Sequence, residues 1–207
     1  MHIISGRFKG FTIPAALKGT RPTTDRTKEA IFSRLEAIGA VEGARVLDLY
    51  AGTGALGFEA LSRGAGQLES VESAGRAAGL LARSAARLAH HPSWDPSMGI
   101  HVSRVKAERF VRPLPAADSP GIDAARSRPG ERPYDLVFMD PPYDLSTEHC
   151  QEVMTCLVEG NLVGPESVIV LERSGRSQQP LPPSGWAVSQ AKSYGETMVF
   201  YIESATA

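Results

Sequence analysis

The sequence has few of the features that mark exported, membrane-spanning or metal-binding proteins. Its 207 residues contain two cysteines, Cys150 and Cys156, which fall in one predicted helix. Two such residues form neither a disulfide framework nor a zinc-ligand cluster. No stretch approaches the roughly 18 apolar residues of a membrane span, and the start, MHIISGRFKG, lacks the apolar core of a signal peptide. We therefore expect a protein of the reducing cytoplasm, with no metal and no membrane-spanning segment.

The sequence also lacks a strong net charge, but its charge is unevenly distributed. The formal net charge is -1, whereas residues 1–28 carry six cations against one acid, Asp25, which leaves -6 for the remaining chain. Basic segments of this kind often face nucleic-acid phosphate, and a solvated surface hairpin is the alternative. Charge alone favours neither. The six cations are Arg7, Lys9, Lys18, Arg21, Arg26 and Lys28.

Strand and helix patterns alternate from residue 45 onward, which predicts one α/β domain with a parallel sheet and helices on both of its faces. Two β-rich runs at residues 186–195 and 196–203 should pair antiparallel, because almost nothing separates them. Short strands near 2–5 and 11–14 predict an N-terminal hairpin. The other expected strands are 45–50, 67–72, 100–105, 134–140 and 167–172, and the expected helices are 25–38, 55–63, 74–90, 107–112 and 146–158.

A glycine-containing loop, DLYAGTG at residues 48–54, follows the first core strand and opens a helix, where glycines let the backbone approach a ligand. Glu72 stands twenty residues after Gly52, at the end of the next strand. An acid there can accept hydrogen bonds from ribose hydroxyls. Asp48 argues against a dinucleotide, whose pyrophosphate would lie beside it. A cofactor with a sulfonium and an ammonium, such as S-adenosylmethionine, suits this carboxylate.

The fourth core strand ends in DPPY, residues 140–143, at the same edge of the sheet as the glycine loop. Two prolines make a stiff turn with few donors, which presents the Asp140 carboxylate, the Pro141 carbonyl and the Tyr143 ring. These groups suit a flat ligand that carries hydrogen-bond donors. A structural end to the strand is the alternative for this motif taken alone.

In this order the motifs resemble a known family. VLDLYAGTGALGFEAL, VES and FMDPPY are similar to class I S-adenosylmethionine-dependent methyltransferases that modify exocyclic amines of bases. IISGRFKG, RPTTDRTKEAIF and KSYGETMVFY resemble the RsmD-type bacterial enzymes that make N2-methylguanine in 16S ribosomal RNA. The resemblance runs through nearly the whole chain. It implies a Rossmann-like fold with a seven-stranded, mostly parallel sheet whose last strand is antiparallel. It also implies an RNA-binding N-terminal β-hairpin, residues 1–20, ahead of the methyltransferase domain, residues 21–207.

The motifs assign a role to each candidate residue. The sequence departs from the family after the third strand, where Lys106-Ala107-Glu108 replaces the usual acid, and we assign the adenine contact to the backbone of Ala107. The expected catalytic residues are Asp140, Pro141, Pro142 and Tyr143. The expected cofactor-binding residues are Asp48, Tyr50, Ala51, Gly52, Gly54, Glu72, Ala107 and Asp140. The expected substrate-binding residues are Arg7, Lys9, Arg21, Thr23 and Arg26.

The function predicted from these motifs is methyl transfer from S-adenosylmethionine to the N2 amine of a guanine in 16S rRNA, by a monomer acting on RNA or on a partly assembled small subunit. A DNA methyltransferase acting on adenine or cytosine is one alternative, because DPPY holds an amine without specifying the base or the sugar. A catalytically silent RNA-binding assembly factor is the other. Transfer to cytosine C5 needs an attacking cysteine, and Cys150 has the pattern of a core residue.

Overall fold

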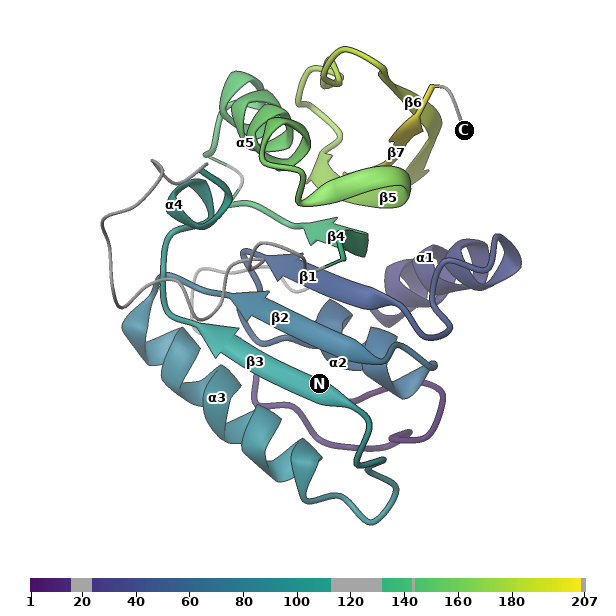
Figure 1. Cartoon of the computed structure of the whole chain (residues 1–207), viewed down its shortest axis with the longest axis vertical. Coiled ribbons are helices and arrows are strands. Elements are labelled where there is room, and N and C mark those ends of the chain that lie inside the picture. Colours follow the sequence, from purple (N-terminus) through teal and green to yellow (C-terminus); the bar gives the residue numbers. More distant parts are fainter. Residues whose placement is uncertain (16–23, 113–131, 143, 206–207) are drawn as a thin grey trace.

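A seven-stranded sheet forms the centre of the protein, with helices against both of its faces (Figure 1). The computed structural model describes residues 1–15, 24–112, 132–142 and 144–205. The strands are β1 (Arg45–Leu49), β2 (Gln67–Val71), β3 (Gly99–Ser103), β4 (Tyr134–Met139), β5 (Val163–Ser174), β6 (Trp186–Tyr194) and β7 (Thr197–Ser204). The helices are α1 (Asp25–Ala37), α2 (Ala55–Ser62), α3 (Gly75–Ala89), α4 (Ala107–Val111) and α5 (Thr147–Glu159).

The strand order is β3-β2-β1-β4-β5-β7-β6. Strands β1 to β5 pair parallel with one another, and β7 pairs antiparallel with both β5 and β6. This arrangement confirms the predicted Rossmann-like fold with a mostly parallel sheet, an antiparallel last strand and a C-terminal hairpin. Several boundaries of these strands differ by one or two residues, and the largest shift is that of β5, which begins at Val163, four residues before the apolar run from which it was predicted.

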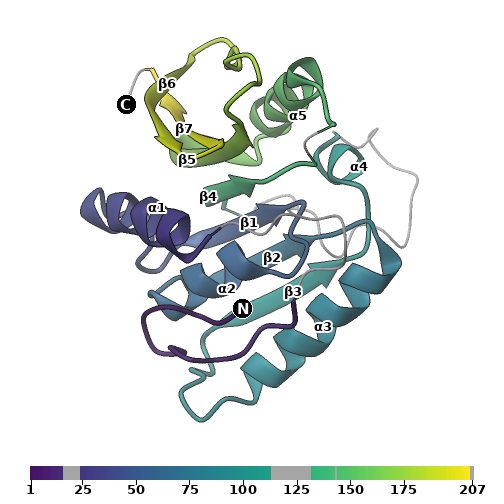
Figure 2. The same ribbon diagram turned by 180° about the vertical axis from the view of Figure 1, so that it is seen from behind.

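Side chains of β1, β2, β4, β5 and β7 pack into two cores on opposite faces of the sheet. In β1, Val46 joins the core formed with α1, α2 and α3, whereas Leu47 and Leu49 join the core formed with α4 and α5. Figure 2 shows the same layers from behind. Cys150 is fully buried in the second core, as its helical spacing predicted. Within the described ranges, no helix has the length and apolar character needed to cross a membrane.

Helix α1 begins where its sequence places a cap. Thr24 has an extended backbone, and its hydroxyl oxygen accepts a hydrogen bond from the amide of Thr27 at 3.2 Å. Such a cap satisfies one of the free amides of the first turn. Ile31, Phe32 and Leu35 are buried, but Ile38, expected to continue this stripe, is the C-cap residue and is 45% exposed. The apolar stripe therefore ends one turn earlier than its spacing predicted.

The N-terminal segment forms a hairpin-like loop that packs onto α2. The expected strands 2–5 and 11–14 are reduced to one antiparallel bridge, between His2 and Thr12. The amides of Ile3 and Ile13 donate across this bridge to the carbonyls of Phe11 and Met1. The pairing extends no further because the next amides, of Ile4 and Ser5, donate to the Glu59 carboxylate of α2 at 2.9 and 3.0 Å. The side chains of Ile3, Phe8 and Ile13 are buried in the first core.

Close contact between this segment and α2 depends on a glycine. Gly6 has a φ of +80°, and a Cβ on it would lie 1.9 Å from the carbonyl oxygen of Ser62. The hydroxyl of Ser62 accepts a hydrogen bond from the amide of Phe8 at 2.9 Å, and its carbonyl accepts one from the amide of Arg7 at 2.8 Å. Only glycine combines this φ with so close an approach.

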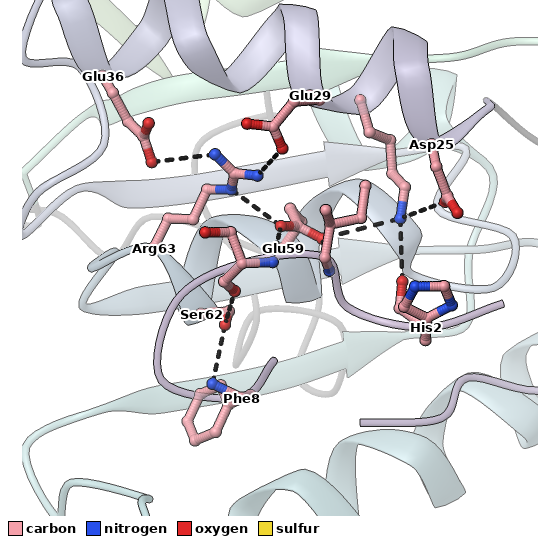
Figure 3. A network of polar contacts seen from close by, with 11 residues as sticks. His2, Phe8, Asp25, Glu29, Glu36, Glu59, Ser62 and Arg63 are labelled. Carbon is pink, nitrogen blue, oxygen red and sulfur yellow. Dashed lines mark hydrogen bonds and ion pairs between the residues drawn. The ribbon is translucent and has the colours of Figure 1, made fainter. Parts of the chain in front are cut away.

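Buried charges join the N-terminal segment, α1 and α2 (Figure 3). Lys28 and Glu59 have fully buried side chains, with their charged atoms 3.7 Å apart. The ammonium of Lys28 also donates to the carbonyl of His2 at 3.1 Å and lies 3.4 Å from a carboxylate oxygen of Asp25. Glu59 accepts a further hydrogen bond from Nε of Arg63 at 2.9 Å. Lys28, counted above with the basic segment, is therefore a buried structural cation and has no surface to offer to phosphate.

We expect Glu59→Gln to lower the free energy of unfolding by about 3–5 kcal/mol, the usual effect of removing one partner of a buried ion pair. The substitution leaves Lys28 buried beside a neutral group, and one amide oxygen cannot replace the two carboxylate oxygens that now accept from Ile4 and Ser5. Urea denaturation measures the change. The matched control is Glu36→Gln, which removes a half-exposed partner of Arg63 and should cost about 1 kcal/mol or less. Equal effects of the two substitutions would contradict the structural role of Glu59.

Candidate active site

A cavity of about 1140 Å³ opens at the carboxyl ends of the parallel strands. Strands β1 and β4 are neighbours, but the chain runs from β1 to β2 and β3 on one side before it returns to β4. Such a reversal of strand order leaves a crevice at that edge of a sheet, where α/β proteins bind ligands. Of the residues expected to bind cofactor or to act in catalysis, those that line the cavity are Asp48, Tyr50, Ala51, Gly52, Glu72, Ala107, Asp140, Pro141 and Pro142.

Two expected residues stand apart from this lining. Gly54 is the N-cap of α2, with a left-handed φ of +79°, and it shapes the loop without lining the cavity. Tyr143 lies outside the described residues. The loop between β1 and α2 also holds Tyr50 at a φ of +60°. A non-glycine residue in this region is strained, and such strain is common at functional sites.

Asp48 places a carboxylate in the floor of the cavity. It is 2% exposed, and its Oδ2 accepts a hydrogen bond from the amide of Gly57 at 3.1 Å. A Cβ on Gly57 would lie 2.9 Å from that oxygen, so glycine is needed for the contact. Burial, together with the nearby carboxylates of Asp140 and Glu72, outweighs the Gly57 hydrogen bond and raises the pKa of Asp48 to about 7. A buried carboxylate of this kind favours a bound cation, which would stabilise its ionised form.

Glu72 follows β2 and holds two loops together at the rim of the cavity. Its Oε2 accepts a hydrogen bond from the amide of Gly52 at 2.9 Å, and its Oε1 accepts one from the amide of Ala74 at 2.7 Å. A carboxylate has about four acceptor sites, so each oxygen retains capacity for a ligand hydroxyl. The acid expected to accept from ribose is thus fixed in orientation by the glycine loop itself.

The Asp140–Pro142 turn forms the opposite wall. Pairing of Leu49 with Met139 in the parallel ladder brings Asp140 beside the loop that begins at Tyr50. Pro141 is buried and Pro142 is exposed. The carboxylates of Asp140 and Asp48 interact through space, because Asp140 contributes to the raised pKa of Asp48. The two motifs that the sequence placed at one edge therefore meet in one cavity.

Two lining residues, Glu108 and His149, were not among the predicted site residues. Tyr50 donates its hydroxyl proton to Oε1 of Glu108 at 3.0 Å, and Nε2 of His149 lies 3.0 Å from the same oxygen. Burial and the Glu108 carboxylate raise the pKa of Tyr50 well above its usual range. Glu108 was visible as the acid next to Ala107, and His149 falls in the first turn of the helix after DPPY. Within the described residues, no group of three or more His, Cys, Asp or Glu side chains could hold a metal ion.

The expected substrate-binding residues lie outside the cavity where they are described. Arg7 and Lys9 are exposed on the N-terminal segment, and Arg7 lies 4.0 Å from a carboxylate oxygen of Asp95. Arg26 is exposed in the first turn of α1. Arg21 and Thr23 lie outside the described residues. The same segment does reach the cavity, through the lining residues Met1, Pro14 and Ala15.

Comparisons with known proteins relate this chain to methyltransferases. The model of the family described as "Conserved hypothetical protein 95" matches residues 1–111 and 118–203. The "Ribosomal RNA small subunit methyltransferase D" of Haemophilus influenzae is 27% identical over 94% of this chain and 89% of its own length. The protein of the same name from Escherichia coli K12 is 27% identical over 95% of this chain and 86% of its own. The solved structure of a hypothetical protein of Thermus thermophilus superposes with a TM-score of 0.72 at 25% identity, covering 98% of this chain and 99% of that one.

The raised pKa of Asp48 predicts a stability cost that depends on pH. Folding raises this pKa from 3.8 to about 7, so the folded state binds more protons than the unfolded state in that window, and stability falls as pH rises through it. Asn has no charge to bury, and its side-chain oxygen can still accept from Gly57. We expect the Tm of Asp48→Asn, relative to the wild type, to be several degrees higher at pH 8 than at pH 5. The control is Asp144→Asn, which changes an exposed acid. The same Tm difference for Asp48→Asn at both pH values would refute the raised pKa.

Proposed function

We propose, from the premise that this chain belongs to the family described as Conserved hypothetical protein 95 and is an RsmD-type, S-adenosylmethionine-dependent methyltransferase, that it methylates the N2 amine of a guanine in 16S rRNA. The observation that carries the proposal is the Asp140–Pro142 turn, which faces the same cavity as Asp48 and Glu72. One carboxylate for an amine and two for a cofactor with a cation and a ribose account for three of the acids that line the cavity.

The lining residues fit S-adenosylmethionine. Asp48 would hold a cationic group, since its buried carboxylate is costly to ionise without one. Glu72 would accept from the ribose with the acceptor sites that Gly52 and Ala74 leave open. The backbone of Ala107, which is buried in the lining, would face the adenine. When bound, S-adenosylmethionine supplies an electrophilic methyl group on a sulfonium.

Asp140 and Pro141 act on the acceptor amine. The lone pair of an exocyclic amine is delocalised into the base, so the nitrogen is a weak nucleophile until its geometry changes. Hydrogen bonds from the two amine protons to the Asp140 carboxylate and the Pro141 carbonyl draw the nitrogen toward a tetrahedral arrangement. Placement of this kind is worth roughly 7–11 kcal/mol. The Asp140 carboxylate also stabilises the positive charge that develops on the nitrogen.

RNA would reach this site with the target guanine turned out of its stack, because the amine of a stacked base cannot enter a cavity. The N-terminal segment, residues 1–15, reaches the cavity through Met1, Pro14 and Ala15 and carries the exposed Arg7 and Lys9, and Arg26 is exposed in the first turn of α1. Phosphate contacts from these residues would position the strand, while the cavity selects the base. One chain supplies all the groups that the reaction needs, which fits a monomer.

We expect Asp140→Ala to reduce kcat by about 100- to 1000-fold, the usual effect of removing one group that stabilises a transition state. The affinity for S-adenosylmethionine should change little, because the carboxylate acts mainly on the acceptor amine. Single-turnover methyl transfer and calorimetry measure the two quantities. The control is Asp144→Ala, which removes an exposed acid from the same lining and should leave kcat within a few-fold. Retention of most of the turnover by Asp140→Ala would remove Asp140 from the mechanism.

The product tests the proposed function directly. Purified enzyme and labelled S-adenosylmethionine should methylate small-subunit RNA from cells that lack the enzyme, and nuclease digestion with mass spectrometry should give N2-methylguanosine. A partly assembled subunit should be the better acceptor, because an ordered RNA spares the enzyme the entropy of fixing a loose strand. Label in DNA as methyladenine or methylcytosine would overturn the RNA substrate and retain the methyltransferase. Cofactor binding without label in any nucleic acid would overturn both RNA and DNA as substrates.

A further inference from the structure

The outer face of α3 carries arginines and no acids. Arg76, Arg83 and Arg87 are all exposed, and their spacing of seven and four residues puts them on one stripe of the helix. The helix sequence, GRAAGLLARSAARLA, contains no Asp or Glu, and neither does any of residues 73–94. An ordinary solvated helix face mixes charges of both signs, whereas this face carries one sign only.

The arrangement is unfavourable for the helix itself. No side chain caps the amides at the start of α3, and its first turn contains no acid. Arg76 stands in that first turn, where the helix dipole disfavours a cation. Arg76 and Arg83 have no ion-pair partner among the described residues. The helix dipole favours Arg87, in the last turn, but disfavours Arg76, and no ion pair explains Arg76 or Arg83. An anionic ligand outside the protein would account for these two.

The arginine stripe runs along the edge of the cavity. Ala77, Leu80 and Ser84 of the same helix line the cavity, and at 100° per residue they form the stripe next to the arginines. Figures 1 and 2 show α3 along the outside of the sheet, beside β3. Phosphates held by Arg76 and Arg83 would therefore pass the mouth of the cavity.

Further cations extend the stripe at both ends of the helix. At its start, the guanidinium of Arg104 lies against Gly75, with one nitrogen 2.6 Å from the position that a Cβ would take, and Lys106 lines the cavity. At its end, the guanidinium of Arg87 lies over the ring of Phe11, 5.0 Å from the centroid. Phe11 belongs to the N-terminal segment that carries Arg7 and Lys9. We call this surface, from Lys106 and Arg104 through Arg76, Arg83 and Arg87 to the segment, the α3 track.

We propose that the α3 track binds the phosphate backbone of the substrate RNA and guides the strand between the cavity mouth and the N-terminal segment. This inference rests on the proposed RNA substrate. From Arg76 to Arg87 the helix rises about 16 Å, enough for contacts to several successive phosphates. Arginine suits this role because its planar guanidinium binds phosphate through two parallel hydrogen bonds. The track would set the register of the strand and leave recognition of the base to the cavity.

Two single substitutions and one control test the track. Arg83→Gln and Arg76→Gln each remove one exposed charge from it, whereas Lys192→Gln removes an exposed charge from β6, at the other edge of the sheet. The experiment measures the affinity of the full chain for small-subunit RNA as a function of salt concentration. The slope of log K against log salt is negative, and each lost phosphate contact should make it less steep by about 0.7–0.9. That change corresponds to about sixfold weaker binding at about 0.1 M salt. The changes in slope should add in the double variant, and Lys192→Gln should leave the slope unchanged.

The outcomes separate the track from the proposed function. An unchanged slope for Arg83→Gln and Arg76→Gln, with methylation of guanine by the wild type intact, would overturn the track alone. If these substitutions weaken RNA binding but the wild type does not methylate guanine, the proposed function is overturned and the track is retained. A slope that changes for duplex DNA but not for RNA would identify the surface as one for DNA and overturn the inference. Calorimetry with S-adenosylmethionine should give equal affinities for Arg83→Gln and the wild type.

Discussion

The buried contact between Lys28 and Glu59 sets the geometry on which the rest of the structure depends. Glu59 lies in α2, and Lys28 lies in α1. The backbone amides that donate to Glu59, those of Ile4 and Ser5, belong to the N-terminal segment. One carboxylate thus fixes three elements, at a desolvation cost that only several simultaneous partners offset. The start of α2 carries the glycine loop, and the N-terminal segment supplies Met1 and Pro14 to the cavity lining. Two parts of the cavity lining are therefore attached to α2, the glycine loop through the chain and the N-terminal segment through Glu59.

The sequence was sufficient to predict the sheet and the edge of the sheet at which Asp48, Glu72 and Asp140 lie together. Apolar runs between helical patterns predict parallel strands, and residues that follow such strands must meet at their carboxyl edge. Asp48, Glu72 and Asp140 could be placed together for that reason, before any distance was known. The turn chemistry was equally local, because two prolines or a loop with two glycines constrain the backbone whatever surrounds them. Local rules and strand order therefore predicted the site's framework.

The contacts that fix the framework were not predictable, because they join residues far apart in the chain. Lys28 counted as one of six surface cations, since composition does not reveal that Glu59, 31 residues later, would bury it. Residues 90–99, HHPSWDPSMG, are rich in proline and polar residues, which is typical of a surface loop, yet the Trp94 ring stacks on Phe8 at 6.0 Å between centroids. The contact of His149 with Glu108 joins α5 to α4, which precedes β4 in the chain. A periodic pattern shows which face of a helix is buried but does not identify its partner.

Acidic and basic side chains lie in different parts of this protein, which the net charge of -1 does not reveal. The cavity lining contains the acids Asp48, Glu72 and Asp140, while the charged side chains of α3 are all arginines. An acidic interior attracts a sulfonium and a base amine and repels phosphate, whereas a basic rim attracts phosphate. The two layers together favour an RNA strand that lies across the rim with one base inside. Salt screens exposed charges far more than buried ones, so higher ionic strength should release the strand while the interior still holds its small ligand.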